Sequence, residues 1–298
     1  MLKNHGRFGY SAIVNRPDFS WPDGKRLAVH LSLNLEHFAY GEGLGISYSP
    51  GLPHPNTYNW AWREYGNRVG VWRILELVDQ LDLPVSLLLN SAVYDHCPEV
   101  VAAFRKRSDE VVGHGRTNSE HQRDFDEAGE AQLIDDVKRA IERHEGKSPK
   151  GWLSPGVNPN ETTPDLLQEA GFTYILDWPM DDQPVWIKTR GGHILSIPSP
   201  QEVNDIPMIC LHHGTAPSFG DMIIDNFDEM LRQSVRQPLV YGIALHAFIT
   251  GQPFRMAHLR RALEHLCGAR DKVWFATTGA IADHFSTRAP IKPEPLLR

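Results

Sequence analysis

Short apolar runs alternate with amphipathic helical patterns along nearly the whole chain. The apolar runs are almost continuous, which is typical of parallel strands covered on both faces, and they span residues 26–35, 84–90, 110–114, 151–154, 173–178, 194–198, 239–246 and 273–277. Between them, apolar residues recur at helical spacing in three stripes: Val71, Leu75 and Val78; Leu133, Val137 and Ile141; and Met256, Leu259, Leu263 and Leu266. This alternation predicts an α/β domain with a mainly parallel sheet, closed or nearly closed into a barrel.

The chain has 298 residues, of which 41% are hydrophobic, and this suits either one large α/β domain or two ordinary ones. Because the alternation is continuous, we expect a single domain over residues 1–298, with an N-terminal arm at 1–25 and two long polar loops at 38–66 and 199–222. Loops of this length inside a compact domain are usually functional or disordered. The aromatic residues of the first loop argue against disorder, so we expect it to cover a pocket or to form a subunit contact.

Charge and cysteine usage exclude several classes of protein. The formal net charge is −7, so no global field favours nucleic acid or an anionic membrane. The three cysteines lie far apart without a CxxC pair, which argues against a disulfide framework or a thiolate zinc site. No apolar run is long enough to span a bilayer, and the first residues lack the apolar segment of a secretory signal. We therefore expect a cytoplasmic protein without nucleic-acid or membrane partners.

Polar side chains follow several of the predicted strands. Glu36, Asn90, His114, Asp177 and His246 all stand at or just after the end of an apolar run. In parallel α/β barrels the loops that leave the carboxyl ends of the strands carry the chemistry. These side chains are therefore expected to gather at one end of the barrel. The sequence contains no GxGxxG, P-loop or GxSxG pattern, so nucleotide binding and serine hydrolysis find no support.

The stretch VVGHGRTNSEHQ offers His114, Asn118 and His121 at spacings of four and three. A helical turn after the strand would put all three on one face, where they could approach a metal ion. Zinc tolerates a carboxamide ligand poorly, and the structural alternative is that His114 caps the strand while Asn118 caps a helix. Spacing alone leaves both interpretations open.

Two further strand ends carry groups suited to acid–base chemistry. Glu36 could bind a metal, act as a general base or pair with an arginine. His246 could act as the general acid that protonates a leaving amine, or it could be a histidine satisfied inside the core. We take Asn34 in LNLEHF, Trp178 in DWPMDDQPVW and Asp205 in EVNDIP as candidate substrate-binding residues.

Several segments, read together, resemble the polysaccharide deacetylase (NodB-homology) superfamily. They are LNLEHF, HGRTN, GWLSPG, DWPMDDQPVW, EVNDIP and LHAFITGQPFRM. The resemblance covers almost the whole chain and is closest to the branch of cofactor-independent allantoinases and bacterial peptidoglycan deacetylase relatives. It implies a distorted, seven-stranded (β/α) barrel of the NodB-homology type, a homo-oligomeric assembly and the hydrolysis of a non-peptide C–N bond. In metal-using members a divalent ion polarises the carbonyl and activates water.

The sequence departs from the superfamily pattern at three places. Asn34 stands at the position of the catalytic base, while Glu36 matches the metal-binding carboxylate. His114 remains from the histidine pair of the second motif, but Asn118 replaces its partner. The arginine of the third motif is absent from GWLSPG. The resemblance therefore leaves three possibilities open: a divalent metal such as zinc held weakly by Glu36, His114 and Asn118, metal-free catalysis, or replacement of the missing ligand by His121.

The first functional hypothesis is a hydrolase acting on an amide, ureide or imide bond of a small substrate. Glu36 would be the base or a ligand, His246 the acid, and His114 a ligand or an orienting group. The second hypothesis is a metal-dependent N-deacetylase of an acetylated sugar or glycan. The third is a non-catalytic ligand-binding module on the same scaffold, which the missing base at Asn34 keeps open.

Overall fold

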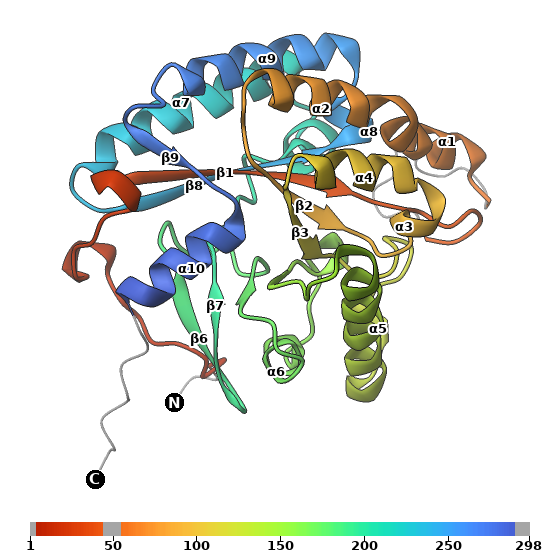
Figure 1. The fold of residues 1–298 in the computed structure, drawn as a ribbon, viewed down its shortest axis with the longest axis horizontal. Helices are drawn as coiled ribbons and strands as arrows, with labels where there is room; N and C mark the ends of the chain where they lie inside the picture. Colours follow the sequence, from red (N-terminus) through yellow and green to blue (C-terminus); the bar gives the residue numbers. More distant parts are fainter. Residues whose placement is uncertain (1–3, 44–54, 290–298) are drawn as a thin grey trace.

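The fold is built on one curled sheet that forms a half-barrel (Figure 1). The structure, a computed structural model, describes residues 4–43 and 55–289. Within these ranges the sheet has nine strands: β1 (Leu27–Leu35), β2 (Val85–Leu89), β3 (Glu110–Gly113), β4 (Gly151–Trp152), β5 (Tyr174–Ile175), β6 (Val185–Thr189), β7 (Gly192–Ser196), β8 (Leu239–His246) and β9 (Val273–Phe275). Their order is β6-β7-β5-β4-β3-β2-β1-β8, and β9 pairs with the first residues of β1. Every pair is parallel except β6–β7, so the prediction of a mainly parallel, barrel-like sheet is confirmed.

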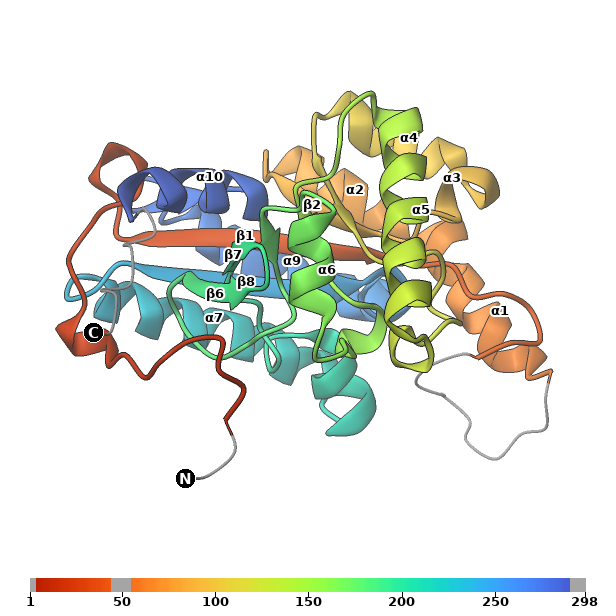
Figure 2. The ribbon, with the colours of Figure 1, turned by 90° about the horizontal axis from the view of Figure 1, so that it is seen from below.

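Helices cover the outside of this sheet (Figures 1 and 2). They are α1 (Thr57–Tyr65), α2 (Val71–Gln80), α3 (Val93–His96), α4 (Pro98–Lys106), α5 (Glu127–Glu145), α6 (Thr163–Glu169), α7 (Ala216–Ser234), α8 (Ala247–Thr250), α9 (Pro253–Cys267) and α10 (Thr278–Arg288). The three apolar stripes seen in the sequence lie on α2, α5 and α9 and contribute buried residues to the core. In the described ranges, none of these helices combines the length and apolar character needed to cross a membrane.

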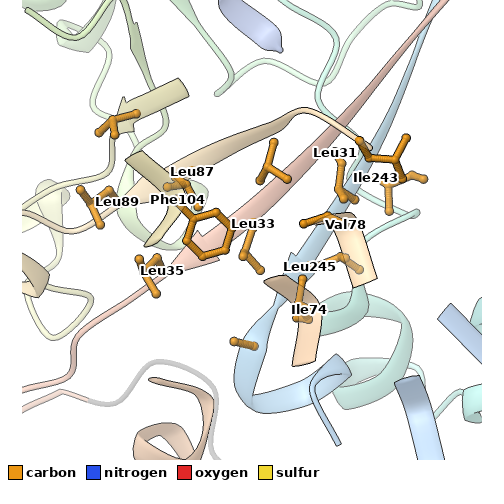
Figure 3. Close-up of a cluster of buried hydrophobic side chains, with 14 of the residues drawn as sticks. Leu31, Leu33, Leu35, Ile74, Val78, Leu87, Leu89, Phe104, Ile243 and Leu245 are labelled. Carbon is orange, nitrogen blue, oxygen red and sulfur yellow. The ribbon is translucent and has the colours of Figure 1, made fainter. Parts of the chain in front are cut away.

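The central strand β1 separates two environments by its alternation. Its odd-numbered leucines, among them Leu31, Leu33 and Leu35, pack against Ile74, Val78 and Phe104 of the outer helices (Figure 3). Successive strand side chains point to opposite faces, so the even-numbered His30, Ser32 and Asn34 face the interior of the half-barrel. All nine residues of β1 are buried. Polar side chains therefore enter the barrel only at positions that the strand period selects.

Both predicted long loops contain helices. In the first, α1 begins after Asn56, whose side chain accepts a hydrogen bond from the Asn59 amide at 3.0 Å. In the second, a helical turn spans Ile206–Leu211, and α7 begins after a capping box between Thr215 and Ser218. The expectation of two uninterrupted long loops was wrong there because these local caps were overlooked. Residues 44–54 lie outside the described ranges. Strand β6 was also missed, since it is held by an antiparallel hairpin with β7.

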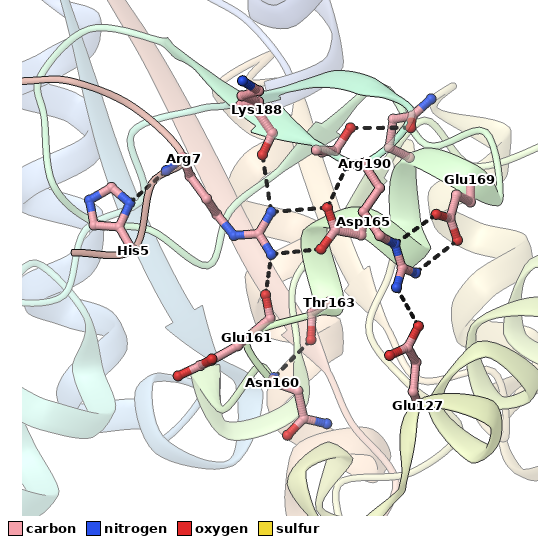
Figure 4. Close-up of polar contacts among 12 residues, drawn as sticks. His5, Arg7, Glu127, Asn160, Glu161, Thr163, Asp165, Glu169, Lys188 and Arg190 are labelled. Atoms are coloured by element: carbon pink, nitrogen blue, oxygen red, sulfur yellow. Dashed lines mark hydrogen bonds and ion pairs between the residues drawn. The ribbon is translucent and has the colours of Figure 1, made fainter. Parts of the chain in front are cut away.

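The N-terminal arm is tied to the body of the protein by ion pairs. Arg7 forms a two-pronged pair with Asp165 of α6, at 2.7 and 3.1 Å, and donates a further hydrogen bond to the Lys188 carbonyl at 3.0 Å (Figure 4). Arg190 lies alongside and pairs with Glu127 and Glu169. Bidentate arginine–carboxylate pairs fix geometry as well as charge, so this part of the arm has a defined position beside α6 and β6.

Candidate active site

Strand register brings the predicted site residues to one end of the half-barrel. Leu35 pairs with Leu89 and Leu89 pairs with Gly113, so the residues that follow, Glu36, Asn90 and His114, form a row. On the other side of β1, Asn34 pairs directly with His246. A cavity of about 340 Å³ opens at this end, and five predicted residues line it: Asn34, Glu36, His114, Asn118 and His246.

Glu36 lies at the centre of the cluster. Its Oε1 is 3.5 Å from Nε2 of His114 and 3.6 Å from Nε2 of His246, and it also accepts a hydrogen bond from the Asn118 amide group. Its Oε2 is buried and receives no hydrogen bond within the described part of the chain. Burial by itself would raise the pKa of Glu36, but His246, His114 and Arg63 outweigh this and lower the pKa. The cavity therefore holds a carboxylate with one oxygen available to another molecule.

His246 is oriented by a fully buried aspartate. Its Nδ1 lies 2.7 Å from Oδ1 of Asp205, whose Oδ2 accepts hydrogen bonds from the His246 backbone amide at 2.8 Å and from the Thr250 hydroxyl. Nδ1–H therefore donates to Asp205, and Nε2 is left facing Glu36. Burial opposes a charged imidazole, but Asp205 and Glu36 outweigh it and raise the pKa of His246. Nε2 is consequently well placed to carry and to donate a proton.

His114 and Asn118 are oriented by hydrogen bonds behind the cavity. Nδ1 of His114 lies 2.7 Å from the Leu153 carbonyl, so it carries a proton, and in the neutral tautomer that this contact selects Nε2 presents a lone pair. The side-chain amide of Asn90 donates to Oδ1 of Asn118 at 3.0 Å and to the His114 carbonyl. Because Oδ1 of Asn118 is engaged in this way, its NH₂ group is the part that faces Glu36.

The donor set does not fit a tightly held divalent cation. Catalytic zinc sites normally have three protein ligands, whereas only Glu36 and His114 offer acceptors here and Asn118 presents hydrogens instead. Among the residues with a defined place, no group of three or more histidine, cysteine, aspartate or glutamate side chains is arranged to hold a metal ion. His121 also lines the cavity, and its side chain is exposed.

The three predicted substrate-binding residues have different positions. Asn34 lines the cavity, although its NH₂ group already donates to the Leu245 carbonyl at 3.1 Å. Asp205 lies behind His246 rather than facing the cavity. Trp178 is turned toward the N-terminal arm, where its ring packs against His5 and Phe8 with centroids 5.7 and 5.8 Å apart. The structure therefore brings only Asn34 of these three to the cavity, because Asp205 and Trp178 find partners elsewhere.

Sequence reasoning missed Arg63 of α1, which also lines the cavity. Its guanidinium carbon lies 3.9 Å from the centroid of the Phe38 ring and 5.0 Å from that of Phe248. Burial lowers the pKa of Arg63 to about 10, with Glu36 opposing the shift, so the group stays charged at neutral pH. The available signal was an arginine among aromatic residues in NTYNWAWREY, which begins with Asn56, an asparagine suited to cap a helix.

Comparisons with known proteins find similarity to polysaccharide deacetylases and to an allantoinase. No family model matches the sequence. The chain is 24% identical to a putative polysaccharide deacetylase of Schizosaccharomyces pombe over 310 residues, which cover 91% of this chain and 94% of that protein. Among solved structures, a probable polysaccharide deacetylase from Pseudomonas aeruginosa PAO1 is 27% identical, with a TM-score of 0.80 over 95% of this chain and 99% of that one. The PuuE allantoinase is also 27% identical, with a TM-score of 0.82 over 96% and 100%. With near-complete coverage on both sides, the chain shares the NodB-homology fold of these polysaccharide deacetylases and this allantoinase.

Proposed function

We propose that this protein hydrolyses a non-peptide C–N bond in a small amide, ureide or imide, with Glu36 as general base and His246 as general acid. The observation that carries the proposal is the row of contacts Asp205–His246–Glu36–His114, of which the last three residues line one cavity. The similarity to deacetylases and to an allantoinase supports the same class of reaction, since both names describe hydrolases of such bonds.

Each of these four residues has a role in the proposed reaction. Glu36 accepts a proton from a water molecule while the water oxygen forms a bond to the carbonyl carbon. His114 Nε2 accepts a second hydrogen bond from the same water and so orients it. As the C–N bond breaks, Nε2–H of His246 protonates the departing nitrogen, and Asp205 stabilises the imidazolium beforehand. Asn118 holds Glu36 in place through its NH₂ group.

The size and lining of the cavity favour a small, polar substrate. A volume of about 340 Å³ is near the lower end of ligand pockets. Besides Asn34 and Asn118, the lining includes the carboxamides of Asn158, Gln201 and Asn204. Carboxamides offer paired donors and acceptors, which match the alternating N–H and C=O groups of ureides and imides. An N-acetyl group on an amino sugar presents the same bond, and the names of the deacetylase relatives make it the second candidate.

The test is a hydrolysis screen of purified protein against ureides, imides and acetylated amino sugars, with Glu36→Gln and His246→Asn as matched variants. We expect turnover of at least one small ureide or imide, and loss of that turnover in both variants with an unchanged melting temperature. Turnover of acetylated sugars alone would select the second candidate. Tight binding without turnover of any substrate would reject hydrolysis and favour a binding module. The cytoplasmic location and homo-oligomeric state remain predictions, which cell fractionation and light scattering can test.

A further inference from the structure

The proposed reaction moves one negative charge within the cavity. When Glu36 takes the proton from water, it becomes neutral, and the electron pair of the C=O bond moves onto the substrate oxygen. The resulting oxyanion needs a positive group or strong donors close by, in a site with little water. Asn118 already donates to Glu36, and His246 is directed between Glu36 and Asp205 for the later protonation of nitrogen. Neither is therefore free to stabilise the oxyanion throughout the step.

Arg63 has the properties that this position requires. Of the described residues that line the cavity, it is the only lysine or arginine. Its side chain is buried, and stacking over the Phe38 ring at 3.9 Å defines the plane of the guanidinium. An arginine keeps its charge in every step of the reaction. Arg63 interacts electrostatically with the Glu36 carboxylate. When Glu36 is protonated, Arg63 loses this negative partner, and the oxyanion on the substrate then supplies a new one.

We propose that Arg63 stabilises the oxyanion formed on the substrate carbonyl and so performs the electrophilic role that the donor set of Glu36, His114 and Asn118 cannot give to a metal ion. This inference rests on the proposed hydrolase function. It differs from a binding role, because an oxyanion exists only in and near the transition state. Arg63 should therefore contribute to kcat much more than to the affinity for the unreacted substrate.

The test compares turnover with substrate binding in Arg63 variants. Arg63→Met should lower kcat by roughly 100- to 1,000-fold, the usual effect of removing an oxyanion donor. The dissociation constant of the unreacted substrate, measured by calorimetry in the inactive Glu36→Gln background with and without Arg63→Met, should stay unchanged. In Arg63→Ala, added guanidinium ion at millimolar concentration should restore part of kcat in a saturable manner. Arg63→Lys keeps the charge without the planar fork and should retain an intermediate kcat.

Arg68→Met is the matched control, because Arg68 lies five residues along the chain and is exposed. It should keep the wild-type kcat, and circular dichroism should show that all variants are folded. If Arg63→Met does not fold, Arg63→Lys replaces it as the test variant. Its kcat should then be lower than that of the wild type by the same factor at every pH. The proposal on Arg63 would be overturned if Arg63→Met kept the full kcat, or if it lost substrate affinity and kcat/KM equally. An inactive Glu36→Gln variant in the same experiment would show that the hydrolase function itself still stands. Inactivity of the wild type on every amide would instead reject the hydrolase function, and this inference with it.

Discussion

The two ends of the half-barrel each contain a glutamate surrounded by donors, but the two are satisfied very differently. Glu110, at the start of β3, accepts hydrogen bonds on both oxygens: from the Tyr174 hydroxyl at 2.8 Å on one, and from the Gly279 amide at 2.8 Å and the Thr278 hydroxyl at 3.3 Å on the other. Glu36, after β1, has its neighbours crowded around one oxygen, and the other has none within the described residues.

Two buried histidines repeat the contrast. His30, deep in the interior, has partners for both ring nitrogens: the Ser32 hydroxyl at 3.1 Å and the Pro198 carbonyl at 3.0 Å. His114 has a partner for Nδ1 only, and its Nε2 is buried without one in the described structure. Buried polar groups are nearly always hydrogen-bonded, so an exception beside a cavity calls for an external partner. Incomplete satisfaction therefore separates the reactive end from the structural end better than residue type does.

The largest expected effect comes from making the same glutamate-to-glutamine substitution at each of the two ends. Glu36→Gln should lower kcat by roughly 1,000-fold, because an amide cannot accept the proton from water, and should leave the melting temperature unchanged. Glu110→Gln should retain kcat but lose about 2 kcal/mol of stability, since only one of the two accepting oxygens would remain for the donors on both sides. Steady-state kinetics and urea unfolding of both variants measure the two effects. A loss of kcat in Glu110→Gln at full stability would end the distinction.

A smaller loss of activity should follow from Asp205→Asn. The variant should lower kcat by about 100-fold, because Nδ1–H of His246 loses its anionic acceptor and the general acid is less well oriented. Asp205 helps to raise the pKa of His246, so its removal should lower that pKa. Activity that needs protonated His246 is lost as the pH rises through this pKa. The alkaline limb of the kcat profile should therefore shift to lower pH, and an unshifted limb would show that His246 is not the acid.

His30 should affect stability in acid without affecting chemistry. Burial lowers the pKa of His30 from 6.5 to about 4 in the folded protein. As the pH falls, His30 therefore binds a proton in the unfolded chain before it does so in the folded protein. The free energy of unfolding that is present above pH 6.5 declines as the pH falls toward 4. The difference in pKa corresponds to about 3 kcal/mol. Urea unfolding at pH 7 and pH 4 should show a smaller decline in His30→Gln than in the wild type, and equal declines would contradict the assignment.

The smallest expected effect is that of metal removal. Because Asn118 presents its NH₂ group to Glu36, chelation and dialysis should leave kcat unchanged, and added zinc should not raise it. Elemental analysis of the purified protein, combined with kinetics before and after chelation, measures this. A stoichiometric metal whose removal abolishes turnover would mean that the reactive end is satisfied by an ion, and it would return Asn118 to the role of ligand.

Much of this organisation could be predicted from the sequence, because strand period and strand ends are local properties. The eight apolar runs correspond to eight strands, and Glu36, His114 and His246 meet because parallel strands end at a common edge. What could not be predicted depends on tertiary partners. Asp205 is placed by its pairing with His246, Trp178 by the N-terminal arm, and Arg63 by aromatic rings distant in the sequence. None of these contacts leaves a periodic signal.

Asn90 illustrates how much can depend on the direction of one amide. Its oxygen accepts from the His37 backbone amide at 2.9 Å and its nitrogen donates to Asn118, so the dipole of Asn118 points its positive end at Glu36. With this polarity Asn118 donates to the Glu36 carboxylate and offers no lone pair to a cation. Reversing that carboxamide, with no change in shape, would present an acceptor in place of a donor, so the ligand character of this wall is set by a residue that stands behind it.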